Sequence, residues 1–397
     1  MKHECQRIHT AIVKAGWLID GTGRPAISDT RLWINNGMIE AVETGPAAAF
    51  GGDADGTAVL DLSEYTLMPA LIDSHVHLVM SGNPDEAVRR HQPAGKFEDA
   101  STVIARHIEE SMRYGVMAVR DGGDGNGHVT QYSDHQMAGH DGRFVLKTAN
   151  RGWYRPGRYG RIVGGRPLSD DKDLESIGRE MGAVDQVKIV NSGLNSLKSF
   201  GRQTPSQFTC EELTAIVAMA AKAEKPVMVH VNGESPVADA VKAGVDSIEH
   251  GYFMGSSNLQ RMADAGVFWV PTVAPMYAYA RLGGEGSDVA GRNMDHQLEQ
   301  LRVARRAGVK VALGTDAGSP GVDHGAGVGL EMSLLLRAGY TIEEVVQAAT
   351  LHGAELLRLS HRGQLAPGRT ALVTAVKGPP GTVPANLGES FVYAGSS

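Results

Sequence analysis

The chain has 397 residues and a formal net charge of −7, and 42% of its residues are hydrophobic. Its basic residues are dispersed, which disfavours nucleic acid as a partner, and no run is apolar enough for a signal peptide or a membrane span. Two cysteines without a C-x-x-C pair indicate a reducing compartment. We therefore expect a cytoplasmic protein that takes a small molecule as its partner, with a homo-oligomer left open.

Both ends of the chain are rich in β-type sequence. Residues 9–65 alternate short apolar segments with glycine, proline and aspartate turns, and the tail after residue 360 resumes this pattern in ALVTAV and SFVYAG. Two such ends most simply pair with each other, so we predict a small β-sandwich built from residues 1–65 and 360–397.

The region between them, residues 66–359, alternates two kinds of segment. Apolar runs typical of strands include 66–78, 186–190, 225–230, 246–250 and 309–316. Stretches with helical periodicity include 99–114, 171–182, 209–223, 235–243 and 293–307. This alternation favours right-handed parallel units, and the length suits one (β/α)8 TIM barrel. The predicted fold class is therefore α/β.

Side chains that can bind metal lie in or at the end of these strand runs: His75, His77, Lys188, His230, His250 and Asp316. Strand ends converge at one rim of a parallel barrel, so these distant residues would meet there. In the first pair, alternation on a strand points His75 and His77 to the same face. Imidazole is the most common nitrogen ligand for zinc-like cations.

Lys188 is unexpected because it lies within the apolar run VKIV, where a lone ammonium is costly. It could reach solvent at the strand edge or pair with Asp185. Alternatively, burial lowers its pKa, so that the free amine reacts with CO2 to give a carbamate that bridges two cations. Its place between histidine-bearing strands favours the second interpretation.

Asp316 ends the last strand run, within GTDAG. A carboxylate beside a metal-activated water can accept its proton and return it to a departing nitrogen or oxygen. The alternative is an ordinary turn or capping role beside the glycines.

Several motifs together resemble the amidohydrolase superfamily over nearly the whole chain: IDSHVHL (72–78), VKI (187–189), VH (229–230), SIEHG (247–251), GTDAG (314–318) and AAT (348–350). The resemblance is to its binuclear-metal members with a carboxylated lysine. Within these, the motifs are most similar to the dipeptidase- and carboxypeptidase-like branch, which is related to imidazolonepropionase.

This resemblance implies roles for the metal-binding candidates. His75 and His77 would bind the more buried of two divalent ions, most simply zinc, and His230 and His250 the second. A carboxylated Lys188 would bridge both ions. Asp316 would then contact the bridging hydroxide and carry its proton to the leaving group.

Substrate-binding candidates lie in three loops. The third loop, residues 151–161, holds four arginines and three aromatic residues. It is either a solvated or subunit-contacting segment, or a site where a guanidinium grips a substrate carboxylate beside an aromatic ring. We select Arg151, Tyr154, Arg155, Arg158, Asn232 and His324. Asn232 follows His230 by two residues, and His324 follows the last strand.

Two residues are discounted. Glu249 directly precedes His250, so strand alternation predicts that its side chain faces the helices rather than the metals. His128 lies in a glycine-rich loop without a strand context, and we expect it to be exposed to solvent.

The favoured function is cleavage of an amide bond in a small N-acyl amino acid or dipeptide-like compound by a metal-bridging hydroxide. Dipeptide-cleaving members usually carry an aromatic residue where this chain has Asn232, and a histidine in the third loop, which this chain lacks. A lactonase or a cyclic amide or imide hydrolase is the alternative. A deaminase is disfavoured by Lys188 and by Gly233 in place of a glutamate, and a non-catalytic scaffold by the retained ligands.

Overall fold

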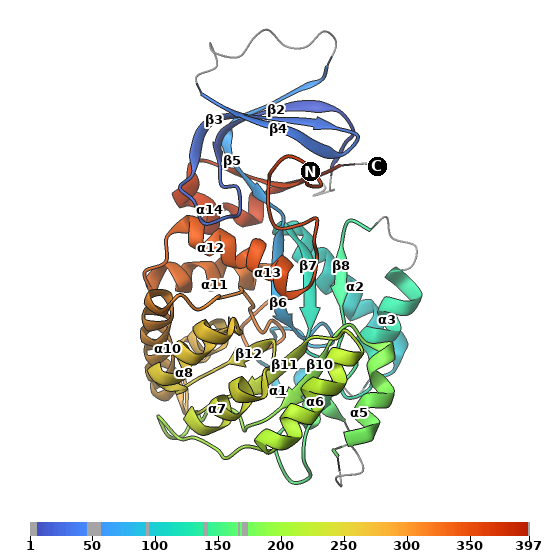
Figure 1. The fold of residues 1–397 in the computed structure, drawn as a ribbon, viewed down its shortest axis with the longest axis vertical. Coiled ribbons are helices and arrows are strands. Elements are labelled where there is room, and N and C mark those ends of the chain that lie inside the picture. The colour runs from blue at the N-terminus through green and yellow to red at the C-terminus, as the bar shows by residue number, and fades with distance from the viewer. Residues whose placement is uncertain are drawn as a thin grey trace.

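The computed structural model describes residues 6–45, 57–92, 95–137, 142–165, 167–168 and 174–395. This part of the chain is a mixed α/β structure. A mainly antiparallel sheet lies at one end of the molecule, and parallel strands surrounded by helices make up the rest (Figure 1).

The sheet at the end of the molecule contains strands from both ends of the sequence. These strands are β1 (Gln6–Ile8), β2 (Ala11–Leu18), β3 (Ile27–Asn35), β4 (Met38–Thr44), β5 (Val59–Pro69), β14 (Leu372–Lys377) and β15 (Phe391–Gly395). Their order is β1-β15-β14-β5-β2-β3-β4, and Val13, Leu32, Leu67 and Val373 pack in its core. The predicted pairing of the two chain ends is thus seen within one sheet. The sandwich arrangement and the boundary at residue 65, through which β5 runs, stay predictions.

The parallel strands form two sheets. One has the order β6-β7-β8 and the other β13-β12-β11-β10-β9. The strands are β6 (Leu71–Val76), β7 (Val116–Asp121), β8 (Val145–Lys147), β9 (Gly152–Trp153), β10 (Val187–Val190), β11 (Val227–Val231), β12 (Ser247–His250) and β13 (Phe268–Val270). Isolated bridges from Val311 to Trp269 and from Ala317 to Val76 connect the last strand run to both sheets. Because the hydrogen-bonded strands form two sheets that only isolated bridges connect, closure into a full barrel stays a prediction.

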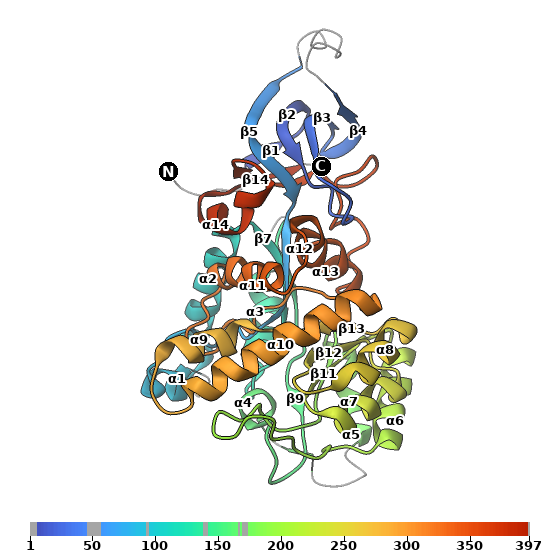
Figure 2. The same ribbon diagram turned by 90° about the vertical axis from the view of Figure 1, so that its left-hand side faces the viewer.

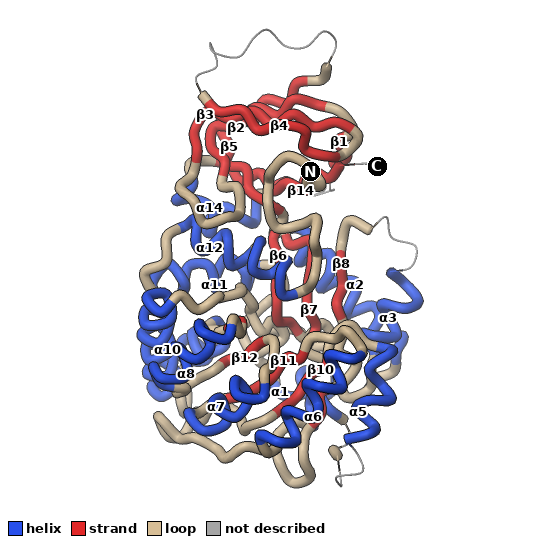
Figure 3. Tube along the Cα trace, in the orientation of Figure 1, coloured by secondary structure: helices blue, strands red, loops and turns tan. Residues whose placement is uncertain are grey.

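Helices lie outside the parallel strands (Figure 3). They are α1 (Glu86–His91), α2 (Phe97–Arg113), α3 (His128–Gln136), α4 (Arg161–Gly164), α5 (Leu174–Glu180), α6 (Cys210–Lys222), α7 (Glu234–Ala243), α8 (Gly255–Ala265), α9 (Ala274–Leu282), α10 (Ser287–Ala307), α11 (Ala326–Arg337), α12 (Ile342–Ala349), α13 (Leu351–Leu356) and α14 (Val383–Asn386). Short 3-10 turns span Met181–Ala183, Pro380–Thr382 and Leu387–Glu389. The first residues of the helix expected at 171–182 lie outside the described residues. No helix in the described ranges is long and apolar enough to cross a membrane.

Alternation along β10 shows how the strands divide the core from the site. Val187 and Ile189 belong to the main apolar core, which also contains Ile216 of α6. Lys188 and Val190, on the opposite face, line a cavity at the carboxyl end of the strands. The same strand therefore buries apolar area against a helix and presents a polar group to the site.

Candidate metal centre

The cavity at the carboxyl ends of the parallel strands holds about 780 Å³ of empty space, including its open mouth. Every metal-ligand candidate from the sequence lies in its wall: His75, His77, Lys188, His230, His250 and Asp316. They come from the end of β6, from β10, β11 and β12, and from the segment after Val311. The structure thus brings together residues that are up to 241 positions apart, as counted from His75 to Asp316.

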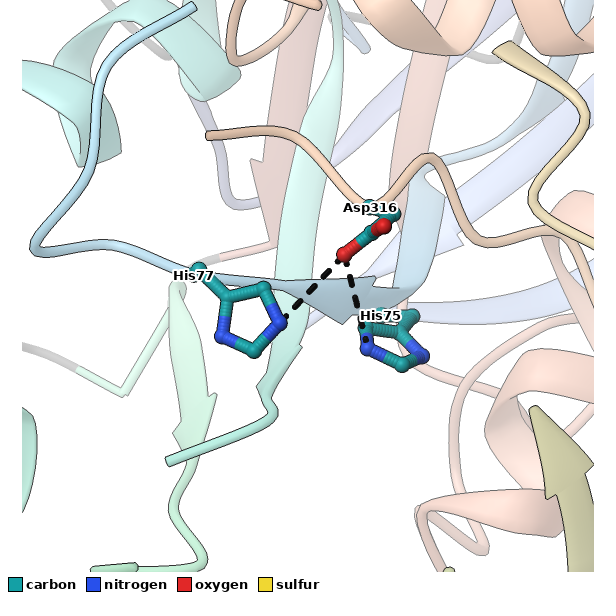
Figure 4. Close-up of side chains that lie close together, drawn as sticks. All are labelled: His75, His77 and Asp316. Atoms are coloured by element: carbon teal, nitrogen blue, oxygen red, sulfur yellow. Dashed lines mark ion pairs between the residues drawn. The ribbon is translucent and has the colours of Figure 1, made fainter. Parts of the chain in front are cut away.

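The first two histidines and the aspartate form a compact group (Figure 4). Asp316 Oδ1 lies 3.3 Å from Nε2 of His77 and 3.7 Å from Nε2 of His75. The Nε2 atom of His75 is buried and has no hydrogen-bond partner. A cation between this nitrogen and the carboxylate of Asp316 would give the nitrogen a partner.

The other two histidines complete a set of neighbouring imidazoles. The His250 ring centroid lies 5.0 Å from that of His75 and 4.5 Å from that of His230. Burial, with a further contribution from the charge of Lys188, lowers the pKa of His75 to about 4. Burial also lowers the pKa of His250 to about 3. Both rings are therefore neutral near pH 7, which is the form that binds metal.

Two glycines allow the histidines to approach the neighbouring backbone closely. A Cβ atom at Gly122 would lie 2.6 Å from Cε1 of His77, and one at Gly314 would lie 2.9 Å from Cβ of His75. Either distance is far below van der Waals contact, so a larger residue would displace a candidate ligand.

Three residues of the site have left-handed backbone conformations. The φ angles are 68° at His250, 45° at Thr272 and 54° at Asp316. Such angles are unfavourable for residues other than glycine, above all for the β-branched Thr272. The hydroxyl of Thr272 lies 2.7 Å from Nδ1 of His250, so the strained backbone positions a partner for the candidate ligand.

Lys188 is 2% exposed, and burial lowers the pKa of its ammonium to about 8. The alternative partner considered from the sequence, Asp185, instead pairs with Lys147 at 3.0 Å. The side chain is therefore held in the cavity wall and does not reach solvent at the strand edge.

Glu249 has a different place from the one that strand alternation predicts. Its Oε2 atom lies 2.6 Å from Nδ1 of His75, and its Oε1 atom accepts a hydrogen bond of 2.8 Å from Arg120. The prediction that Glu249 faces the helices is wrong. Ser247 and Glu249 share the interior face of β12, as alternation requires, and the left-handed backbone of His250 breaks the alternation so that His250 reaches the cavity as well.

This glutamate sets the tautomer of a ligand candidate. Burial opposes the charge of Glu249, but Arg120 and the bond to His75 outweigh it, and its pKa lies below the ordinary value. The ionised carboxylate accepts the Nδ1 proton of His75, which leaves the Nε2 lone pair free to bind a cation. A signal in the sequence was available, because Arg120 in the buried run 116–121 requires an acidic partner.

The substrate-binding candidates of the third loop are placed away from the cavity wall. Arg151 forms an ion pair with Glu180, and Arg155 forms one with Glu212. Arg158 donates to the carbonyl of Pro205 at 2.8 Å, and the buried Tyr154 donates to that of Gly165 at 2.9 Å. None of Arg151, Tyr154, Arg155 and Arg158 lines the cavity.

Of the other two substrate-binding candidates, one lines the cavity and one does not. Asn232 lines the cavity, and its Oδ1 atom accepts a hydrogen bond of 2.9 Å from the backbone of Tyr252. His324 does not line it: the ring is 2% exposed and stacks on His107 with centroids 4.1 Å apart.

His128 is also buried, with Nε2 lying 3.1 Å from the carbonyl of Gly95, so the prediction of solvent exposure is wrong. The ring packs near Phe97 at the start of α2.

The remaining wall of the cavity was not predicted from the sequence. It consists of tyrosine, aliphatic and uncharged polar side chains: Tyr159, Val163, Val190, Leu194, Asn195, Leu197, Tyr252, Thr272, Pro275, Met276, Tyr279 and Ser319. Most of them come from loops and from α9, where no periodic pattern marks a residue as facing a site.

Comparisons with known proteins agree with this geometry. The model of the Amidohydrolase family matches residues 66–395. Ochratoxinase from Aspergillus niger is 27% identical over 380 residues, which cover 85% of this chain and 75% of that protein. Imidazolonepropionase from Nocardia farcinica is 25% identical over 397 residues, covering 93% and 92% of the two chains.

Solved structures show the same similarity. A Xaa-Pro dipeptidase with methionine bound in its active site has a TM-score of 0.82 at 26% identity, and the match covers 97% of this chain and 100% of that one. Crystalline A. niger ochratoxinase has a TM-score of 0.76 at 23% identity over 96% and 94% of the chains. These neighbours imply the TIM-barrel fold. The chain belongs to the amidohydrolase family, and it is a hydrolase that acts on carbon–nitrogen bonds.

Proposed function

We propose that this enzyme hydrolyses an amide bond in a small N-acyl amino acid or dipeptide-like compound, and that it uses two divalent metal ions, most simply zinc. The observation that carries the proposal is the convergence of neutral imidazoles, a buried lysine and an aspartate on one cavity. The names of two relatives, ochratoxinase and a Xaa-Pro dipeptidase, support an amide or peptide substrate.

The residues present fit a pair of cations. His75 and His77 would hold one ion, for which the unpartnered Nε2 of His75 is available. His230 and His250 would hold the other, and Asp316 would contribute an oxygen ligand. Nitrogen and oxygen donors of this kind are the usual zinc ligands.

Lys188 would supply the bridge as a carbamate. With its pKa lowered to about 8, part of the lysine is uncharged near neutral pH. The amine nitrogen attacks the carbon of CO2, an N–C bond forms, and the nitrogen loses a proton to solvent. The product would be an anion whose two oxygens could bind the cations. This change also removes the cost of a buried ammonium.

Bound cations of this kind supply water that ionises near neutral pH, and they polarise the amide carbonyl. Asp316 then handles the proton: its Oδ1 atom faces His75 and His77, while its Oδ2 atom accepts a hydrogen bond of 3.0 Å from Ser319. The carboxylate is thus fixed in orientation and can carry a proton from the attacking water to the departing nitrogen.

The test compares zinc-loaded enzyme with enzyme stripped by a chelator, on a library of N-acyl amino acids, dipeptides and lactones. We expect release of free amine from at least one amide substrate by the zinc-loaded form and none by the stripped form. Turnover of lactones alone, or equal amine release without metal, would contradict the proposal.

A further inference from the structure

Few of the described cationic side chains near the cavity are available to bind a substrate carboxylate. Among the described residues that line the cavity, Lys188 and the histidines are metal-ligand candidates, and no arginine is present. Arg151 and Arg155 of the third loop already have acidic partners in Glu180 and Glu212. A substrate carboxylate would therefore need a cation from another part of the rim.

Arg89 of α1 reaches the loop that follows Asp316. Its Nη1 atom donates to the carbonyl oxygen of Gly318 at 2.7 Å and to that of Ser81 at 3.1 Å. Ser319, the residue after Gly318, lines the cavity and donates to Asp316. Arg89 does not itself line the cavity, but these bonds hold its guanidinium against the segment that contributes Ser319 to the wall.

Three segments pack together around this arginine. The backbone of Gly321 donates to the carbonyl of Gly82, just before α1, at 2.7 Å. A Cβ atom at Gly321 would lie 2.9 Å from Cβ of Ala278 in α9. Helices α1 and α9 accordingly appear near each other in Figure 2. Arg89 thus lies near the place where the segment before α1, the segment after Asp316 and α9 meet.

The groups that act electrostatically on Arg89 belong to the cavity. They are Tyr279, Asp316 and Tyr159, all of which line it. Arg89 is half-buried, and burial lowers its pKa from the ordinary value, although a guanidinium stays charged at any working pH. No carboxylate of the described residues lies within ion-pair distance of it. A guanidinium that is held in place and partly desolvated is suited to form two parallel hydrogen bonds with a planar anion such as a carboxylate.

We propose that Arg89 is the specificity residue that binds the free carboxylate of the substrate at the mouth of the cavity. This inference rests on the proposed amide hydrolysis and adds the part of the substrate that is recognised. The aliphatic wall formed by Leu194, Leu197 and Met276 provides space for an apolar group of the same substrate.

The experiment uses zinc-loaded full-length enzyme and a matched pair of probes, N-acetyl-leucine and N-acetyl-leucinamide. The wild type is expected to favour the free acid. Arg89→Met should lower kcat/KM for the acid by about ten- to a hundred-fold, mainly through KM, and leave the amide and the metal content unchanged. Arg151→Met is the matched control and should keep the wild-type preference.

A purely structural role would give a different pattern. If Arg89 only joins Gly318 to Ser81, Arg89→Met should affect both probes equally, and that result overturns the inference. Arg89→Lys keeps the positive charge but cannot make a bidentate contact, so the preference of this variant for the acid over the amide should fall several-fold. If the methionine variant does not fold, Arg89→Lys is the deciding variant. An unchanged preference in Arg89→Lys overturns the inference.

Binding separates this inference from the proposed function. Calorimetry of both probes on the zinc-loaded protein requires no turnover. Weaker binding of the acid alone to Arg89→Met supports the inference, even if the wild type hydrolyses neither probe and the amidase proposal fails. Equal binding of the acid to both proteins overturns the inference, even if hydrolysis is observed.

Discussion

Glu249 Oε2 lies 2.6 Å from Nδ1 of His75, and both side chains are completely buried. On its other oxygen, Glu249 accepts a hydrogen bond from the equally buried Arg120. The interior of the parallel strands thus holds an ion pair directly below the candidate metal centre. The cost of burying both charges is offset by their contact and by the bond to the histidine.

The first prediction concerns this contact. Glu249→Gln keeps the shape of the side chain but removes the charge that orients the imidazole of His75. We expect zinc affinity to fall by about ten- to a hundred-fold, as measured by competition with a chromogenic chelator. Glu331→Gln is the control, since Glu331 is also buried but accepts from the backbone of Val273 and Ala274. Equal zinc affinity in Glu249→Gln and wild type would show that the contact does not tune the site.

Lys188→Met should change the metal count. If a carboxylated lysine bridges two ions, protein grown with zinc holds about two metals per chain, and the variant holds about one while staying folded. Elemental analysis gives the count, and circular dichroism checks the fold. The same metal content in both proteins would remove the bridging role.

Asp316→Asn should separate catalysis from substrate binding. The amide retains much of the hydrogen bond to Ser319 but cannot carry a proton. We expect kcat to fall by about a hundredfold or more, with a smaller change in KM. Ser319→Ala is a useful companion, because it only loosens the carboxylate and should have a weaker effect. A kcat for Asp316→Asn close to that of wild type would contradict proton transfer by this residue.

Glu331 should make stability depend on pH. Burial raises its pKa from 4.5 to about 8, so the folded protein favours the protonated acid more than the unfolded chain does. Its contribution is complete below the unfolded pKa of 4.5 and is lost as the pH rises through about 8. The Tm of the wild type should therefore fall relative to that of Glu331→Gln between about pH 5 and 8. Parallel Tm curves for the two proteins would show that Glu331 does not have this raised pKa.

The sequence predicted the site better where residues lie on strands than where they lie on loops. His75, His77 and Lys188 follow from strand alternation and from the convergence of strand ends, and the structure places all three in one cavity. Glu249 was assigned to the wrong face, because the left-handed φ of His250 is not visible in a pattern of residue types.

Loop residues could not be placed in this way. The arginines of the third loop were candidates for binding a carboxylate, but Arg151 and Arg155 pair with acids on α5 and α6. Glu180 is 29 positions from Arg151, and Glu212 is 57 positions from Arg155. No local sequence pattern predicts ion pairs over such separations. Arg89 was overlooked for the same reason, since its partner Gly318 is 229 positions away.

The most direct test of the account is a zinc titration of metal-free enzyme, followed by the rate of amide hydrolysis on a substrate from the library screen. We expect no hydrolysis without metal and a rate that reaches its maximum at about two equivalents of zinc per chain. A metal-free enzyme that hydrolyses the amide as fast as the zinc-loaded form would contradict the account.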